Sequence, residues 1–144
     1  MDRIGRGIVA GFIATFALSL LLDPLVMLSR SMWTPAATFG WYHFFAGPVI
    51  WGVGFAFVHD HLIGPSWARG VAFAAATACL LLLGSLPFGG AALFGDGRAI
   101  VTIATVFLVH AAYGALLGLA YGLVASDMQL TRRGKGDRMH PSVR

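Results

Sequence analysis

Long uncharged runs of apolar residues dominate the chain and set its expected architecture. Four runs approach or exceed the roughly twenty residues that a helix needs to cross a hydrocarbon layer about 30 Å thick. They cover about residues 4–29, 36–59, 68–87 and 99–125. The period-two alternation of membrane β-strands is absent, and helices satisfy their own backbone groups in lipid. We therefore expect an all-α integral membrane four-helix bundle over residues 1–126.

Clusters of Pro and Gly separate the apolar runs and predict the turns. They fall at Trp33-Thr34-Pro35, at Ile63-Gly64-Pro65 and from Pro87 to Gly97, where such residues interrupt regular structure. After the last run, residues 127–144 are polar and basic, with no apolar period from Thr131 onward. This composition predicts a disordered tail that is attracted to anionic lipid headgroups.

Composition agrees with a membrane protein and argues against a nucleic-acid partner. Of the 144 residues, 58% are apolar and 11% are charged, whereas soluble domains have about a quarter of charged residues. The net charge is +4 and the pI about 10.0, but the basic residues are scattered at helix ends and in the tail. One expected side carries Arg3, Arg6, Arg69, Arg132, Arg133, Lys135, Arg138 and Arg144, and the other carries Arg30 and Arg98. The richer side should be cytoplasmic, which places both termini in the cytoplasm.

An internal repeat relates the two halves of the chain. The second and fourth expected helices align at one fixed offset, which matches His43 with His110, Gly47 with Gly114, and Asp60 with Asp127. The first and third align more weakly at a slightly shorter offset, with Arg6-Gly7-Ile8 over Arg69-Gly70-Val71. The pattern predicts two tandem helical hairpins related by a pseudo-two-fold axis along the membrane normal, with chance agreement in a Gly-rich chain as the alternative.

Small residues recur every fourth position on three of the expected helices. The stripes are Gly7, Gly11, Thr15 and Ser19; Gly70, Ala74 and Ala78; and Gly114, Gly118 and Gly122, with Gly47 on the remaining helix. Such stripes let helix backbones approach closely in lipid. They predict packing positions within the bundle, or alternatively a face that meets another subunit.

Charged residues at the expected cytoplasmic rim have the unfavourable sign for the helix dipole. Asp60 and Asp127 fall at helix C-terminal ends, and Arg6 and Arg69 fall at N-terminal ends. Pairing across helices would offset both penalties. We expect Arg–Asp ion pairs at this rim; the alternative is that each side chain reaches into the headgroups without a partner.

Two histidines and one aspartate fall near the opposite leaflet. Between His43 and Asp60 the expected helix rises about 25 Å, and His110 and Asp23 have a similar expected depth. Polar side chains there are costly unless they pair or meet water, so they define a candidate site. The alternatives are hydrogen bonds that only hold helices together, or a haem held between His43 and His110.

The remaining motifs favour no reaction. There is no Gly-rich phosphate loop, no His-Glu-x-x-His and no Glu at all, and the sequence assembles neither a nucleophile with a base nor a complete metal set. His59-Asp60-His61 is interpreted as an interfacial turn rather than a metal site. We therefore expect a non-enzymatic protein without a cofactor, acting by helix–helix association as a homo-oligomer or as an accessory subunit. A binder or transporter of haem, protons or a small ligand, using His43 and His110, is the alternative.

The sequence resembles a family of small four-helix bacterial membrane proteins that is known only as a domain of unknown function. The resemblance covers about residues 4–122. Its motifs are Gly40-Trp41, His43-Phe44, Gly47, Trp51-Gly52 and Phe55-Ala56, then Pro87, Gly89-Gly90 and Leu93-Phe94-Gly95, and finally His110, Tyr113-Gly114-Ala115, Leu117-Gly118 and Tyr121-Gly122. It implies a bacterial inner-membrane location and a four-span layout, and it implies no activity. Asp23 lies outside this pattern.

Overall fold

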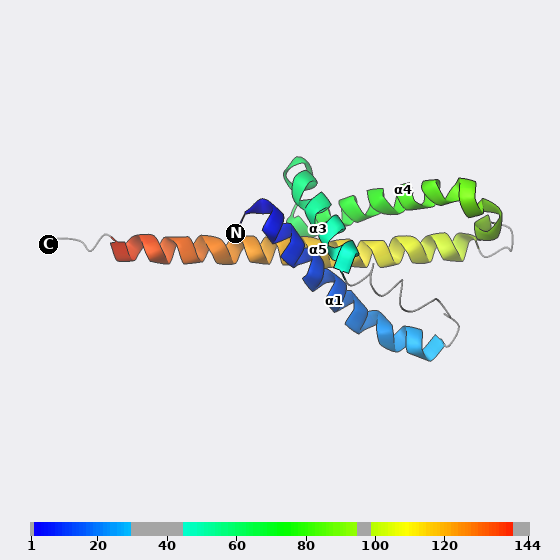
Figure 1. Ribbon diagram of the computed structural model, residues 1–144, viewed down its shortest axis with the longest axis horizontal. Coiled ribbons are helices and arrows are strands. Elements are labelled where there is room, and N and C mark those ends of the chain that lie inside the picture. The colour runs from blue at the N-terminus through cyan, green and yellow to red at the C-terminus, as the bar shows by residue number, and fades with distance from the viewer. Residues whose placement is uncertain (1, 30–44, 95–98, 140–144) are drawn as a thin grey trace.

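The computed structural model describes residues 2–29, 45–94 and 99–139, and within them the chain is entirely helical apart from turns. The elements are α1 (Arg3–Ser29), α3 (Gly47–Val58), the short 3₁₀ turn η2 (His59–His61), α4 (Ser66–Phe94) and α5 (Ala99–Met139). The expected all-α class is confirmed, with four helices packed together (Figure 1).

Three of these helices are long and apolar enough to cross a membrane. The candidate spans are Arg3–Leu22, Ser66–Gly84 and Ile103–Ser126, and on this ground the chain is a multi-pass membrane protein. The helix expected over 36–59 is described only as α3, which has 12 residues, because residues 36–44 lie outside the described part. Pro48 stands in its first turn, where a missing N–H has no cost.

The turn expected from Pro87 to Gly97 begins later than predicted. Helix α4 passes through Pro87 and ends at Phe94, so its expected end at residue 87 was wrong. A proline removes one backbone hydrogen bond, and in membrane helices neighbouring groups satisfy the carbonyl that it leaves unpaired. In Figure 1 the last turns of α4 bend toward the start of α5.

The tail also departs from the expectation. Helix α5 has 41 residues and ends at Met139, so residues 127–139 continue the helix that was expected to stop near residue 125. No proline stands between Ala99 and Pro141, and Gly134 or Gly136 alone costs only about 1 kcal/mol in a helix. At 1.5 Å per residue α5 is about 60 Å long, and Figure 1 shows it running well past the other helices.

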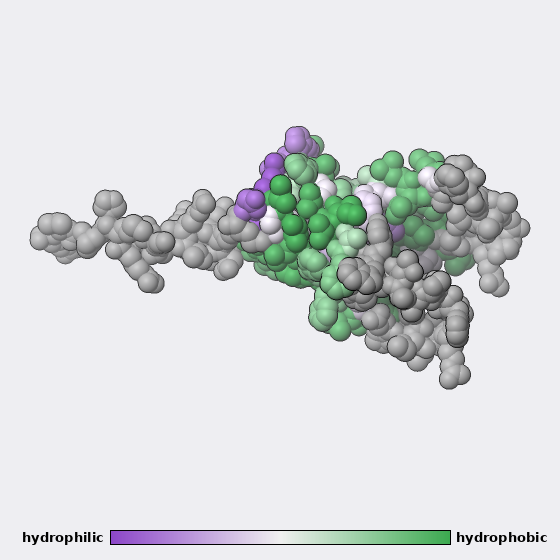
Figure 2. All heavy atoms as spheres, viewed as in Figure 1, coloured by the Kyte–Doolittle hydropathy of each residue, from purple (hydrophilic) through white to green (hydrophobic). Residues whose placement is uncertain are grey.

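The helices pack as two pairs, α1 with α3 and α4 with α5, and α1 also lies along α5. A small core joins the pairs. Its buried members are Ala10, Ala14, Phe55, Ala56, Leu117, Ala120 and Tyr121. Of the residues in the apolar stretches of α1, α4 and α5, 33%, 22% and 22% are fully buried, and the others are partly or fully exposed. Hydrophilic residues gather at one end, over the start of α1 and the η2 turn (Figure 2), and we call this the polar end.

Candidate functional site at the His59 turn

Each helix pair is held by a glycine crossing near the polar end. A Cβ atom on Gly7 would collide with the carbonyl oxygen of Gly52, and one on Gly52 would collide with that of Gly7. The same reciprocal contact joins Gly70 of α4 to Gly114 of α5. The backbones therefore touch directly, as close packing in lipid favours, and Cα–H groups come within reach of facing carbonyls.

Two further small-residue contacts lie beside these crossings. A Cβ on Gly11 would meet the carbonyl of Pro48, and one on Gly118 would meet the carbonyl of Ser66. Gly122 faces the Ser66 side chain, with the Oγ atom 3.2 Å from the position of a Cβ. Gly47, also expected at a packing position, is buried at the start of α3. All the contacts of Gly7, Gly11, Gly70, Gly114, Gly118 and Gly122 are thus within one molecule.

The connection from α3 to α4 is folded back by Arg69. Its Nε–H donates to the carbonyl of Gly64 at 2.7 Å, and its Nη1–H donates to the carbonyl of His59 at 3.2 Å. Gly64 has a φ of +107°, a backbone conformation that residues other than glycine rarely adopt. This fold brings the first residue of α4, Ser66, back to the His59 ring.

His59 has hydrogen-bond partners on both ring nitrogens. Nδ1 lies 2.8 Å from Asp60 Oδ1, and Nε2 lies 3.3 Å from Ser66 Oγ. An ionised carboxylate only accepts, so in the neutral ring Nδ1 carries the proton and donates to Asp60. Nε2 is then the acceptor, and the Ser66 hydroxyl donates to it. Two successive hydrogen bonds thus link the side chains of Ser66, His59 and Asp60.

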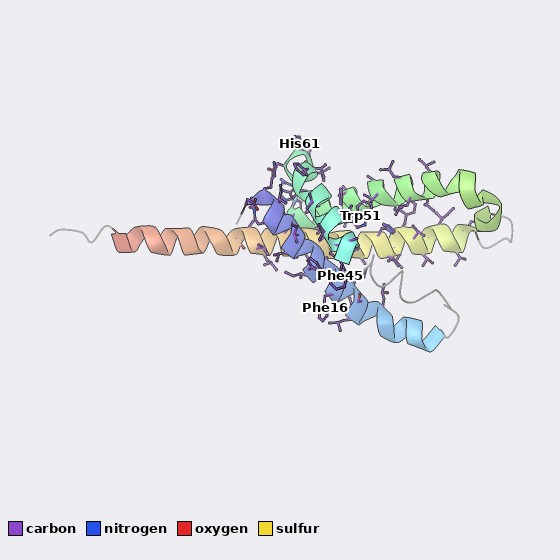
Figure 3. All side chains as sticks on the ribbon, in the orientation of Figure 1. Phe16, Phe45, Trp51 and His61 are labelled. Atoms are coloured by element: carbon purple, nitrogen blue, oxygen red, sulfur yellow. The ribbon has the colours of Figure 1, made fainter. Side chains whose placement is uncertain are left out.

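Aromatic packing holds the His59 ring in place. Its centroid is 5.3 Å from that of Phe55 and 4.6 Å from that of Tyr121, and 12% of the His59 side chain is exposed. Neighbouring His61 takes no part, since it lies at the outer tip of the turn, away from the helices (Figure 3). The ring orientation of His59 is therefore fixed by its surroundings.

Asp60 is the acidic centre of the polar end. It forms an ion pair with Arg3, and the hydrogen bond from His59, followed by the charges of Arg3 and Arg69, lowers the pKa of Asp60 below its usual 3.8. The carboxylate therefore stays ionised at neutral pH, as a hydrogen-bond acceptor for His59.

The arginines named in the expected ion pairs have other contacts here. Arg69 donates to backbone oxygens, as above, while the Arg6 guanidinium lies over the Tyr121 ring with its Cζ atom 5.5 Å from the centroid. Arg6 Nε is buried without a hydrogen-bond acceptor among the described residues. The arginine paired with Asp60 is Arg3, and the side chain of Asp127 lies outside the described part.

The expected cluster near the opposite leaflet is described only at His110. Its Nδ1–H donates to the Val106 carbonyl at 2.8 Å, one turn earlier in α5. His43 and the side chain of Asp23 lie outside the described residues, so the structure does not test the expected cluster. Among the residues that it describes, no three His, Cys, Asp or Glu side chains are grouped so that they could hold a metal ion.

Sequence reasoning missed Ser66 and Tyr121 as neighbours of His59. The available signal was the Gly64-Pro65 turn, which reverses the chain between His59 and a serine seven residues later. That spacing fixes neither the return path nor the donors, which depend on Arg69 and on the packing of α5. The neighbours of His59 could therefore be predicted only with knowledge of how the helices pair.

The fold and the polar end define a small all-helical, multi-pass membrane protein with a hydrogen-bonded cluster at one surface. The sequence profile of a family of unknown function, DUF6789, matches residues 1–132, and the chain belongs to this family. No curated protein and no solved structure matches the chain.

Proposed function

We propose that the chain is a protein of the bacterial inner membrane that works by helix–helix association, as a homo-oligomer or as an accessory subunit of a larger membrane complex. The observation that carries this proposal is that two thirds or more of the residues in the span stretches are not fully buried by the described part of the chain. The described glycines on the stripes contact the chain's own helices. Association would therefore use the large apolar side chains on the outer faces.

We propose that both termini lie in the cytoplasm. Arg3, Arg6 and Arg69 belong to the polar end together with the η2 turn, and an excess of basic residues favours the cytoplasmic side. Helix α5 leaves the membrane at the same end and carries the basic segment 127–139 outward. This segment is suited to contact anionic headgroups or a cytoplasmic face of a partner.

We also propose that the two helix pairs are related by a pseudo-two-fold axis along the membrane normal. Gly7 and Gly70, which match in the weaker of the two sequence alignments, both lie at a glycine crossing. The sequence separation between their partners, Gly52 and Gly114, is one residue shorter than that between Gly7 and Gly70. Gly52, rather than the Gly47 of the sequence match, therefore occupies the place equivalent to Gly114.

Contacts beside the crossings support the same axis. Arg6 lies over Tyr121, and Arg69 Nη1 lies 3.5 Å from Nδ1 of His59. The sequence separation between Arg6 and Arg69 equals that between Gly7 and Gly70. The separation between His59 and Tyr121 likewise equals that between Gly52 and Gly114. The rings of His59 and Tyr121, with centroids 4.6 Å apart and planes tilted by 40°, would then face each other across the axis.

Association is tested by cross-linking in native membranes, with the chain expressed at its natural level. The expected product is a discrete band above the 15.2 kDa chain, identified by mass spectrometry as a dimer or as a complex with one membrane partner. After mild detergent extraction the same species should migrate as one complex. A chain that is monomeric both in membranes and in mild detergent would overturn the proposal.

One observation favours a second function, the binding of haem, a proton or a small ligand near His110. The hydrogen bond from Nδ1 to Val106 fixes the ring tautomer, as backbone carbonyls do for metal-binding histidines. Nε2 then carries a lone pair that can bind a metal or accept a proton. A Soret band in purified protein that disappears in His110→Leu would support haem binding, whereas a featureless visible spectrum would exclude it.

A further inference from the structure

The hydrogen-bonded chain Ser66–His59–Asp60 has the donor order of an activated nucleophile. The hydroxyl of Ser66 donates to His59 Nε2 at 3.3 Å, and His59 Nδ1 donates to Asp60 at 2.8 Å. A base that receives the hydroxyl proton, and that is oriented by a third group, is what nucleophilic serine chemistry requires. The Oγ–Nε2 distance is longer than the usual hydrogen bond, as is common for such pairs without substrate.

The start of α4 supplies backbone donors beside Ser66. The N–H groups of Ala68 and Arg69 donate to the carbonyl of Pro65 at 2.9 and 3.1 Å. The earlier N–H groups, of Ser66 and Trp67, have no acceptor within the helix because of their position in its first turn. N–H groups beside a nucleophile can stabilise an oxyanion that forms there.

Ser66 lies at the end of a candidate span, beside exposed side chains. Ser66 is half-buried and is the first residue of a candidate span, so it lies at the boundary between hydrocarbon and headgroups. Ile63 and Trp67 on either side are 97% and 51% exposed, and such side chains settle into the interfacial layer. Gly122 packs closely against Ser66, since a Cβ there would lie 3.2 Å from the Ser66 Oγ.

We propose that Ser66 is the nucleophile of an acyl-transfer site that takes carboxylic esters of membrane lipids, with His59 as general base and Asp60 as a positioning residue. Ester carbonyls of membrane lipids lie at the interfacial level where the polypeptide places Ser66. This activity goes beyond the proposed association and does not depend on it.

The reaction needs no further co-reactant than water. Ser66 Oγ forms a bond to the ester carbonyl carbon while its proton passes to His59 Nε2. The bond from that carbon to the alcohol oxygen then breaks, and the proton on Nε2 passes to the departing alkoxide. Water next attacks the acyl-serine ester, giving its proton to Nε2. That proton returns to Ser66 Oγ as the carboxylic acid leaves.

Charged and aromatic groups from four elements face the His59 ring. Asp60 on η2 accepts a hydrogen bond from it, and Arg3 on α1 forms an ion pair with Asp60. Arg69 on α4 lies 3.5 Å from Nδ1, and Tyr121 on α5 presents an aromatic ring over which Arg6 lies. Asp60 is the sole carboxylate among these described neighbours, so its removal should loosen the orientation of the ring.

The test uses the full chain in lipid nanodiscs and an alkyl fluorophosphonate probe, which forms a covalent bond to activated serines with loss of fluoride. We expect one label per chain, mapped to Ser66 by peptide mass spectrometry. Ser66→Ala should abolish labelling, and His59→Gln should slow it about a hundredfold or more, the usual worth of a general base. Asp60→Asn should slow labelling and Asp60→Glu should restore part of the rate at an equal thermal midpoint, which a purely structural role would not do.

Ser126 provides the matched control. It lies on α5, is exposed, and its hydroxyl donates to the Leu123 carbonyl at 2.9 Å, with no histidine bound to it among the residues that the structure describes. Ser126→Ala should leave the labelling unchanged. Wild-type protein that takes no label, or that is labelled at Ser126 as fast as at Ser66, would overturn the proposal without any variant at the site. Equal labelling of wild type and folded His59→Gln, with equal thermal midpoints, would also overturn it. Monomeric chain that still labels would separate this activity from association.

Discussion

The two helix pairs are built on the same crossing but differ in what stands next to it. In α1–α3 the crossing joins Gly7 to Gly52, and in α4–α5 it joins Gly70 to Gly114. Three residues after the first glycine of each pair stand Ala10 and Phe73, respectively. Ala10 is fully buried in the core, whereas Phe73 is a partly buried ring packed against that core.

This difference explains why the pairs meet asymmetrically. Helix α1 lies along α5, where small Ala10, Ala14 and Ala120 permit a close approach. Helices α3 and α4 are in contact through rings, since the Phe73 centroid is 5.5 Å from that of Phe55 and 6.3 Å from that of Trp51. Glycines therefore set how helices join within a pair, and the neighbouring side chain sets how one pair meets the other.

The largest expected effect comes from adding a methyl group at a crossing. In Gly70→Ala the new Cβ would collide with the Gly114 carbonyl, and backbone cannot yield as a flexible side chain does. We expect a loss of about 1–3 kcal/mol or more, the usual cost of overpacking, or failure to fold. The measurement is the thermal midpoint of the purified chain in one detergent.

Gly84→Ala on the same helix is the control for this prediction. A Cβ on Gly84 would have no atom of a neighbouring described residue within 4 Å. Alanine also stabilises a helix by about 1 kcal/mol relative to glycine. Its midpoint should stay level or rise. Gly7→Ala should repeat the loss in the other pair; a tolerant Gly7 beside an intolerant Gly70 would mean that the two crossings are not equivalent.

A smaller effect is expected from removing the ring between the pairs. Phe73→Ala deletes two ring contacts, each worth about 0.5–1.5 kcal/mol, so the stability should fall by about 1–3 kcal/mol, seen as a lower thermal midpoint. Phe16→Ala is a suitable control, because Phe16 is on the outer face of α1 and 64% exposed. Equal losses in both variants would mean that lipid contact, not the ring contacts, decides stability.

The smallest effect is the pH dependence of stability that Asp60 of the η2 turn causes. No charged counterpart of Asp60 is described on α5. Because the pKa of Asp60 is lowered in the folded chain, its contribution to stability is present above the ordinary value of 3.8. It is lost as the pH falls through the folded value. We expect wild type to be slightly more stable than Asp60→Asn at pH 6 and the difference to shrink as the pH falls below 3.8, as measured by thermal midpoints. A constant difference across this range would contradict the prediction.

Much of the fold follows from the sequence because lipid makes long apolar runs helical whatever their neighbours. The ends of helices do not follow in the same way. Pro87 marked a turn by local propensity, yet α4 continues to Phe94, and the polar residues 127–139 looked disordered although nothing in them breaks α5.

The candidate site was less predictable than the fold. Four-residue spacing marked Gly70 and Gly114 as packing positions, but not their partners. The His59 cluster depends on a positive φ at Gly64 and on the two backbone contacts of Arg69. Such tertiary contacts leave no periodic signal in the sequence. His43 and the side chain of Asp23, on which the expected outer cluster depended, lie outside the described residues, so that prediction stands as it was made.

The central claim, that lipid surrounds apolar helices joined at glycine crossings, is tested most directly by hydrogen–deuterium exchange of the chain in lipid nanodiscs. Exchange should be slow through Arg3–Leu22, Ser66–Gly84 and Ile103–Ser126, and slowest around Gly7, Gly52, Gly70 and Gly114. Residues 60–65 should exchange fast. Amides of Ile103–Ser126 that exchange as fast as those of residues 60–65 would contradict it.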